Sequence, residues 1–335
     1  MQQKIKSAKK RAPRNRTLTL DHDDIKKLRP SLTVKTKVAN LGEVKNRVVC
    51  GDTFKLLGEL PASSFDLLFA DPPYNLTKDF GKEKFRETSL ELYEGWLEGW
   101  VKACVPLLKR TASIYICGDW RSASAIQRIG MRYFKLRNRI TWEREKGRGS
   151  KTNWKNASED IWFFTVSEDY VFNIDDIQVK RKVLAPYTEN GKPKDWQQSK
   201  DGNFRLTYPS NLWTDLTVPF WSMPENTDHP TQKPEKLLAK IILASTREND
   251  LILDPFLGSG TTAVVAKKLN RNFVGIEADE VYCMLAEKRL HLAETDKTIQ
   301  GFTNGVFWER NTLNLQNPKN GKGVANATQP SLPQK

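Results

Sequence analysis

The sequence has few cysteines, and none of them is paired at short spacing. Cys50, Cys104, Cys117 and Cys283 are scattered along 335 residues, and no C-x-x-C pattern occurs. This excludes a disulfide framework and a cysteine-ligated zinc site as organising features, and it fits a reducing cytoplasm. We therefore expect no structural metal.

Long apolar runs are also missing. No stretch approaches the ~18 consecutive apolar residues of a membrane-spanning helix. The basic start of the chain, residues 1–16, is not followed by the apolar segment of a secretory signal. We therefore expect a cytoplasmic protein.

Acidic residues are outnumbered, with 40 Asp and Glu against 54 Lys and Arg, which gives a formal net charge of +14. A charge of this size favours a polyanionic partner such as nucleic acid, although it also serves solubility alone. With 38% hydrophobic and 10% aromatic residues, the chain is otherwise typical of a folded globular protein.

Short β-type runs alternate with helical patterns, which indicates an α/β fold with a doubly wound, mostly parallel sheet. Strands are expected at residues 47–50, 65–70, 113–117, 138–142, 161–165, 251–254 and 273–277. Helices are expected at residues 90–108, 235–245, 262–269 and 280–292. In the first of these helices, Tyr93, Trp96 and Trp100 recur at helical spacing, so we expect its tryptophans in the core.

The chain divides into five expected parts. The α/β domain has a catalytic half in residues 46–174 and a second half in residues 226–300. Residues 175–225, where periodicity fades and aromatics stand among Lys, Asn and Gln, are expected to be an insertion. A basic flexible arm (1–45) precedes the domain, and a partly disordered tail (301–335) follows it.

A proline-rich turn follows the expected strand at 65–70. The turn, Asp71-Pro72-Pro73-Tyr74-Asn75, is compatible with an ordinary strand ending. Its two prolines also fix the backbone so that a carboxylate, a carbonyl and an aromatic ring project together. This second interpretation predicts a functional site.

A glycine-rich turn, LDPFLGSGTT (253–262), follows the expected strand at 251–254 and opens a helix. Its glycines let a ligand approach the backbone, and the helix N-terminus offers N–H groups to a carboxylate or phosphate. The turn lacks the lysine of a P-loop and departs from G-x-G-x-x-G. Glu277 ends the next strand about where an acidic residue grips a ribose. The pattern favours a ligand that carries adenosine but has no phosphate to cradle.

Both turns lie at the carboxyl ends of strands, where doubly wound sheets bind ligands. If the two strands are neighbours, both turns face one cleft. A cofactor on the glycine turn would then present its reactive end to Asp71.

The two motifs, together with HPTQKP (229–234), resemble the β-class DNA amino-methyltransferases of bacterial restriction–modification systems. In that circularly permuted class the catalytic motif precedes the cofactor motif, as here, and the resemblance extends from about Val48 to Leu292. It implies the Rossmann-like, seven-stranded-type fold of S-adenosylmethionine-dependent methyltransferases, with S-adenosylmethionine as the cofactor. It also implies double-stranded DNA as the partner, on the nucleoid in a bacterial cytoplasm. A homodimer is left open.

The resemblance also implies residue roles. The implied catalytic residues are Asp71, Pro72, Pro73 and Tyr74. Among the implied cofactor residues, Asp52 lies near the adenine, Glu277 contacts the ribose, and Thr231 and Lys233 close the methionine end. The residues implied to line the methionine and sulfonium region are Asp254, Phe256, Gly258, Ser259 and Gly260, and Thr261 and Thr262 are further implied cofactor residues. His229 is expected to be structural rather than a general base.

The implied chemistry starts from an exocyclic amino group whose lone pair is delocalised into the base. The Asp71 carboxylate and the Pro72 carbonyl would accept its two N–H bonds, which localises electron density on nitrogen and orients it. Tyr74 would stack on the base, which must first be flipped out of the duplex.

The target base is expected to be adenine, methylated at N6. In N4-cytosine enzymes of the family, Ser commonly replaces the first Asp of the motif. N4-cytosine methylation stays open, because adenine and cytosine both present an amino group beside a ring nitrogen. Methylation of RNA stays open as well. C5-cytosine chemistry needs a cysteine, typically in a Pro-Cys motif, and no cysteine here follows a proline. The alternative from another class is a non-catalytic, basic DNA-binding protein on a methyltransferase frame.

DNA selection is expected to fall to residues 175–222, the place of target recognition in this class. Its aromatics, such as Trp213, Phe220 and Trp221, are equally compatible with packing inside a small subdomain. Contacts to the DNA backbone are expected from the loop that carries Lys146, Arg148, Lys151 and Asn153, for which the alternative is an ordinary solvated turn.

Overall fold

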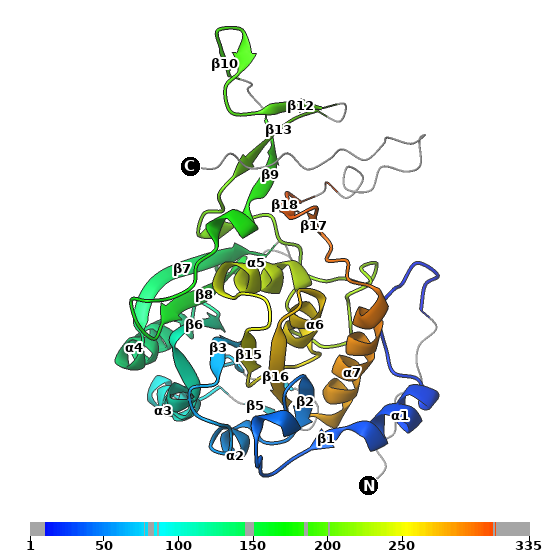
Figure 1. The fold of residues 1–335 in the computed structure, drawn as a ribbon. Helices are drawn as coiled ribbons and strands as arrows, with labels where there is room; N and C mark the ends of the chain where they lie inside the picture. The colour runs from blue at the N-terminus through cyan, green and yellow to red at the C-terminus, as the bar shows by residue number, and fades with distance from the viewer. Residues whose placement is uncertain are drawn as a thin grey trace.

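A computed structural model describes residues 11–312, apart from residues 77, 80–83, 86, 145–150, 184–186, 200–201 and 311. Its centre is a sheet of nine described strands in the order β1-β2-β16-β15-β3-β6-β8-β7-β14 (Figure 1). Their bounds are β1 Thr33–Val34, β2 Arg47–Cys50, β16 Asn272–Glu277, β15 Leu251–Asp254, β3 Phe65–Ala70, β6 Leu108–Gly118, β8 Ser158–Thr165, β7 Lys135–Glu143 and β14 Leu212–Trp213.

Most neighbouring strands of this sheet are parallel. Only β8 runs against its two neighbours, β6 and β7. The predicted α/β fold with a mostly parallel sheet is therefore confirmed. Three of the expected strands, β2, β3 and β15, have the predicted bounds, and the other four extend beyond them.

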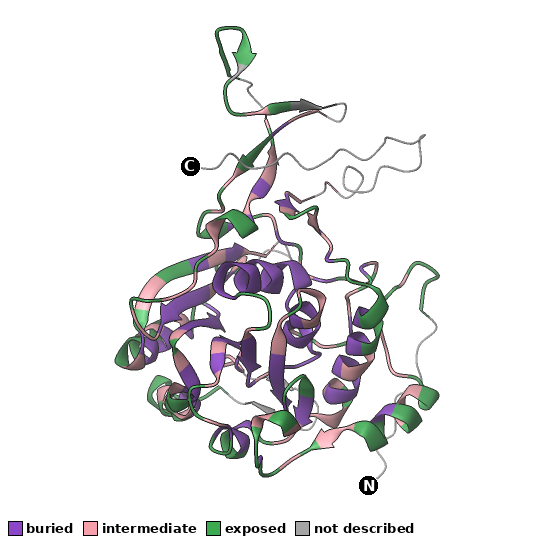
Figure 2. Ribbon diagram, in the orientation of Figure 1, coloured by how far each residue is buried: buried purple, intermediate pink, exposed green. Residues whose placement is uncertain are grey.

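Helices cover both faces of the sheet, and each face has its own apolar core. The helices are α1 His22–Leu28, α2 Thr53–Leu57, α3 Leu90–Cys104, α4 Ala123–Tyr133, α5 Glu235–Ser245, α6 Thr261–Lys268 and α7 Glu280–Thr295, with single 3-10 turns at Arg29–Ser31, Leu41–Glu43, Val105–Leu107 and Ile174–Ile177. Helices α2, α3 and α4 pack on one face, and α5, α6 and α7 pack on the other. The fold is thus doubly wound, and α5 is buried along its whole length (Figure 2).

Helix α3 is shorter than the sequence predicts. It ends at Cys104 rather than at residue 108 because Pro106, which has no N–H to donate, lies in the turn that follows, and Leu108 already begins β6. Trp100 is fully buried as expected, but Trp96 is only half-buried.

Part of the expected N-terminal arm is folded onto the domain. Within residues 1–45, β1 pairs with β2 at the edge of the sheet, and α1 begins with a capping box formed by Asp21 and Asp24. Lys288 of α7 donates hydrogen bonds to the Thr19 carbonyl and the Asp24 carboxylate. The interpretation as a flexible arm is therefore wrong for this part, and residues 1–10 lie outside the described residues.

The expected insertion forms a second, smaller sheet, and two strands within residues 302–308 also belong to this sheet. Its order is β12-β13-β9-β18-β17, with β12 Gln197–Ser199, β13 Gly202–Thr207, β9 Val179–Lys182, β18 Val306–Trp308 and β17 Phe302–Thr303. Two short hairpins complete the described strands, β4 Lys78–Asp79 with β5 Lys84–Phe85 and β10 Thr188–Glu189 with β11 Lys192–Pro193. The boundary predicted at residue 301 is therefore corrected, because Phe307 and Trp308 pair with β9 and Trp308 packs against Phe204.

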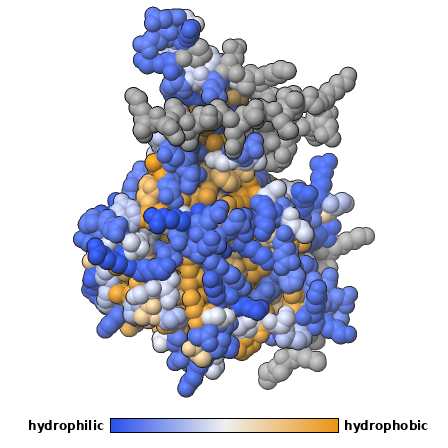
Figure 3. Space-filling model, viewed as in Figure 1, coloured by the Kyte–Doolittle hydropathy of each residue, from blue (hydrophilic) through white to orange (hydrophobic). Residues whose placement is uncertain are grey.

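The hairpins of the insertion project from the body of the molecule, and the part of them that is coloured is hydrophilic at its surface (Figure 3). No helix in the described part of the chain is long and apolar enough to cross a membrane.

Candidate active site

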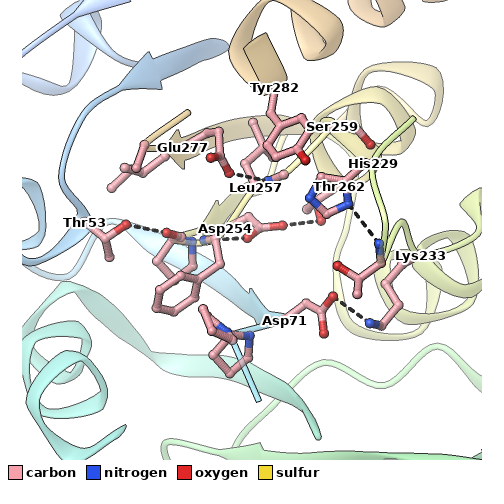
Figure 4. A pocket seen from close by; sticks show the side chains of 18 of the residues that line it. Thr53, Asp71, His229, Lys233, Asp254, Leu257, Ser259, Thr262, Glu277 and Tyr282 are labelled. Carbon is pink, nitrogen blue, oxygen red and sulfur yellow. Dashed lines mark hydrogen bonds and ion pairs between the residues drawn. The ribbon is translucent and has the colours of Figure 1, made fainter. Parts of the chain in front are cut away.

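The two turns singled out in the sequence lie at the ends of neighbouring strands. Strands β3 and β15 pair in parallel, with Leu67 opposite Ile252 and Leu68 opposite Leu253. Asp71 and the glycine turn therefore follow the same edge of the sheet, as expected, and both line one cavity of about 640 Å³. Figure 4 shows Asp71 with Lys233 at one side of this cavity and Asp254 and Glu277 toward the other.

Asp71 lies in a network of buried polar groups. The hydroxyl of Tyr74 donates to Asp71 Oδ1 at 2.8 Å, and Lys233 Nζ donates to Asp71 Oδ2 at 2.6 Å. Lys233 Nζ also lies 3.2 Å from the Tyr74 hydroxyl and 3.3 Å from Glu159 Oε2. Lys233 and Glu159 are only 6% and 5% exposed, so these charges interact with little screening by water.

The buried charges fix the protonation of their neighbours. Burial acts to lower the pKa of Lys233, but the carboxylates of Asp71 and Glu159 outweigh it and hold that pKa above its ordinary value. The pKa of Tyr74 is raised well above its usual value by burial and by the same two carboxylates. Lys233 is therefore cationic and Tyr74 a protonated donor at neutral pH, and both direct hydrogens at Asp71.

Lys233 lines the cavity and also contacts the catalytic turn. The resemblance implies that it closes the methionine end of the cofactor pocket, which stays a prediction, and its ammonium group contacts Asp71. Thr231 does line the cavity, with its N–H donating to His229 Nδ1 at 3.4 Å. Gln232, between them, fixes the loop because its side chain bonds to Glu225 and Thr227.

Neighbouring residues hold the turn around Asp71. The hydroxyl of Tyr93 donates to the Pro73 carbonyl at 3.2 Å, and the Asn75 side chain both donates to and accepts from the backbone of Thr88. Pro72 is buried, while Pro73 and Tyr74 are half-buried at the cavity wall. The turn is therefore pre-organised, as a positioning site requires.

The glycine turn closes the opposite wall. Gly258 and Gly260 have φ values of +57° and +87°, which favour glycine. Ser259 is buried, and among the described residues its Oγ has no hydrogen-bond partner. The turn leads into α6, whose first two residues, Thr261 and Thr262, line the cavity, and the start of a helix favours an anionic group.

Asp254 is a buried carboxylate at the base of this turn. It accepts hydrogen bonds from the Thr262 hydroxyl at 2.5 Å and from the Phe256 N–H at 3.0 Å. Burial raises its pKa to about 7 in spite of these two bonds. Thr261 links the two walls, because its hydroxyl donates to the Lys233 carbonyl and accepts from Arg289.

The remaining expected cofactor residues lie along the next two strands. Glu277, at the end of β16, accepts from the Gly258 and Asp279 N–H groups, both at 2.8 Å. Asp52, after β2, caps α2 through Phe54 N–H and lines the same cavity. Phe54, Trp96 and Phe256 form an aromatic wall, with ring centroids 6.1 and 5.9 Å from that of Trp96. Trp96 packs against the core, as expected, and also lines the cavity.

These residues fit S-adenosylmethionine. An aromatic wall suits the adenine, and the Glu277 carboxylate suits ribose hydroxyls. Asp71 supplies negative charge for a sulfonium, and the start of α6 suits a carboxylate. A Cβ at Gly258 would lie 3.0 Å from His229 Nε2, so this glycine keeps the cradle open. Among the described residues, no group of three His, Cys, Asp or Glu could hold a metal ion.

Sequence reasoning missed Glu159 and Arg144, and it missed Phe54 and Tyr282, which line the cavity. Glu159 lies at the start of β8 and carries the second negative charge on Lys233. Arg144, which follows β7, donates to Glu159 in turn. The available signal was a pair of acidic residues, Glu159 and Asp160, directly before the apolar run of β8. Of the expected DNA contacts, Lys151 and Asn153 are exposed, and Lys146 and Arg148 lie outside the described residues.

Residues 65–288 match the family described as DNA methylase. The chain belongs to this family. The predicted family and its activity class, DNA methyltransferase, are thereby confirmed, and S-adenosylmethionine is the methyl donor of such enzymes.

Individual DNA methylases show the same relationship. The type II methyltransferase M.HpaI of Haemophilus parainfluenzae is 35% identical over 262 residues, 76% of each chain. The DNA adenine methyltransferase YhdJ of Escherichia coli K12 is 34% identical over 261 residues, 75% of this chain and 85% of the relative. The solved PvuII DNA methyltransferase, which is cytosine-N4-specific, shares the fold with a TM-score of 0.55 at 22% identity, over 72% of this chain and 85% of that one.

Gly258→Val tests the cradle of this methylase. Valine at this position would be forced into a left-handed backbone conformation, and its side chain would collide with His229. We therefore expect calorimetry to show that the affinity for S-adenosylmethionine falls about 100-fold or more. Gly305→Val is the matched control, because Gly305 has a φ of +74° but nothing within 4 Å of its Cβ position. Equal affinities of the two variants would contradict the assignment of the pocket.

Proposed function

We propose that this DNA methylase transfers a methyl group from S-adenosylmethionine to the N6 amino group of an adenine flipped out of duplex DNA, as the modification enzyme of a restriction–modification system. The observation that carries the proposal is the position of Asp71 and Pro72 beside the glycine turn, at the ends of paired strands. The relative YhdJ, a DNA adenine methyltransferase, supports adenine as the base, as does aspartate at the head of the catalytic motif.

Asp71 and Pro72 position the amino group. Their carboxylate and carbonyl oxygens accept its two N–H bonds, which directs the nitrogen lone pair out of the plane of the base. When bound, S-adenosylmethionine supplies an electrophilic methyl group. As the nitrogen gains positive charge, the Asp71 carboxylate stabilises it until a proton is lost to solvent.

Lys233 and Tyr74 orient this carboxylate. Each occupies one of its oxygens, and each oxygen keeps a second lone pair for the substrate. Glu159 balances the charge of Lys233, so the substrate still meets a negative Asp71. The half-buried ring of Tyr74 is available to support the base.

Nucleoside analysis tests this function. The purified enzyme is incubated with S-adenosylmethionine and mixed-sequence duplex DNA, which is then digested and analysed by mass spectrometry. We expect N6-methyladenine, and sequencing of the methylated bases gives the recognition sequence. N4-methylcytosine as the product, or methylation of RNA alone, would overturn the proposal. Homodimer formation stays an open prediction.

A further inference from the structure

The strand order separates two sides of the active-site edge. Strands β2, β16 and β15 lie on one side of β3; Asp52 follows β2, and Glu277 and Asp254 end β16 and β15. Strands β8, β7 and β14 lie on the other side, beyond β6. Because β7 runs antiparallel to β8, which runs antiparallel to β6, β7 and its parallel neighbour β14 end at the same edge as β3. The cofactor residues on these strands therefore lie on one side of Asp71. The other side, toward β7 and β14, is available to the substrate.

A second hollow of about 320 Å³ lies on that side. It adjoins the active-site cavity, since both are lined by His229, Thr231 and Gln232. Its other walls are Arg144, Val218, Pro219, Phe220, Trp221, Asn226 and Pro230.

The aromatic wall of this hollow is open to solvent. Phe220 is 39% and Trp221 is 51% exposed, and their rings meet edge to face at 6.4 Å. Arg144 faces them from the end of β7, anchored on Glu159 and lying over the Trp142 ring. Among the described residues, the Arg144 Nε has no hydrogen-bond partner. Exposed rings beside a guanidinium are not explained by core packing.

The wall is held in place by the N-terminal segment. The Arg16 N–H donates to the Trp221 carbonyl at 2.6 Å, and the Leu18 N–H donates to the Asn226 carbonyl at 2.7 Å. Arg11 forms an ion pair with Asp228 at 2.7 Å. These contacts fix the loop and place the exposed Arg16 beside the hollow, and Arg14, two residues earlier, is exposed as well.

We infer that this hollow holds a nucleobase of the methylated strand, the immediate neighbour of the target base. The inference rests on the proposed function. Exposed aromatic rings with an arginine suit the stacking of an unpaired base, and the basic segment suits its phosphates. The hollow is continuous with the cavity at Asp71, and the DNA strand that carries the target base must continue over the surface beside that cavity. The base in the hollow is therefore that of the adjacent nucleotide.

The test compares Trp221→Ala with wild type on two kinds of duplex. One carries the recognition sequence intact, and the other has an abasic analogue in place of the nucleotide on the 5′ or the 3′ side of the target. Stacking on one base contributes ~1–3 kcal/mol, so we expect kcat/KM of Trp221→Ala on intact DNA to fall at least about fivefold. At one of the two neighbouring positions, the abasic analogue should lower kcat/KM of the wild type. In Trp221→Ala, the same analogue should lower kcat/KM by less than about a further twofold.

Two further variants sharpen the test. Trp221→Phe keeps a ring and should keep most of the activity and the coupling. Phe172→Ala removes an exposed aromatic that follows β8 from the opposite edge of the sheet, and it should change neither. Unchanged kcat/KM of Trp221→Ala on intact DNA, or additive defects at both positions, would overturn the inference. In either case, formation of N6-methyladenine by the wild type would leave the proposed function standing.

Discussion

Asp71→Ala is expected to lower the single-turnover rate of methyl transfer about 100- to 1,000-fold, while S-adenosylmethionine affinity stays within several-fold of wild type. The variant removes the carboxylate that orients the amino group and stabilises its developing charge, and one such group contributes ~10²–10³-fold in other preorganised sites. Cofactor binding should persist, because the hydrogen bonds of Asp71 go to Tyr74 and Lys233, not to the glycine turn.

The protein should also stay folded, since Lys233 keeps Glu159 as its partner. Asp71→Asn preserves the shape and one acceptor oxygen but loses the charge, so its rate should lie between those of wild type and Asp71→Ala. Asp169→Ala, in the exposed loop after β8, serves as a control that removes a carboxylate elsewhere. Rapid-quench measurement with labelled cofactor gives the rates, and full activity of Asp71→Ala would contradict its assigned role.

Lys233→Met should lower the rate about 100-fold or more, again with nearly unchanged cofactor affinity. The substitution removes the cation that holds Asp71 Oδ2 and leaves two buried carboxylates with Arg144 as their nearby counter-charge. Breaking a buried ion pair in this way costs ~3–5 kcal/mol. Thermal unfolding should therefore show a destabilised protein beside the loss of rate.

The double variant Lys233→Met/Glu159→Gln separates stability from catalysis. It removes one charge of each sign, so the melting temperature should recover toward that of wild type. The rate should stay low, because the double variant lacks Lys233, the donor to Asp71 Oδ2 in the described part of the chain. Loss of cofactor affinity with an intact rate at saturating cofactor would instead support the position at the methionine end that the family resemblance implies.

The parts of the site that the sequence predicts best are the ones set by strand ends. The runs FDLLFA and LILD are apolar and short, and both motifs follow them directly, so their shared edge could be inferred before any pairing was known. The role of Lys233 could not be inferred this way. It depends on a contact between residues 162 positions apart, which no local period encodes.

Composition misled the prediction at both ends of the chain. The basic start of the chain suggested a flexible arm, although Asp21 and Asp24 already had the spacing of a capping box. Helix α4 was also missed, although Ser122 stands at its N-cap position and Ala125, Ile126 and Ile129 recur at helical spacing. The strands after residue 301 were missed because each has only two or three residues and gains stability from pairing with the insertion.

The central claim is that the cofactor and the target amine meet at Asp71. A crystal structure of the enzyme with sinefungin, an unreactive analogue of S-adenosylmethionine, and a duplex carrying the recognition sequence tests it most directly. We expect the analogue along the glycine turn and the flipped adenine with its amino group on Asp71 and Pro72, facing the amine that replaces the transferable methyl group. An adenine bound elsewhere, or an analogue whose reactive end points away from Asp71, would contradict the account.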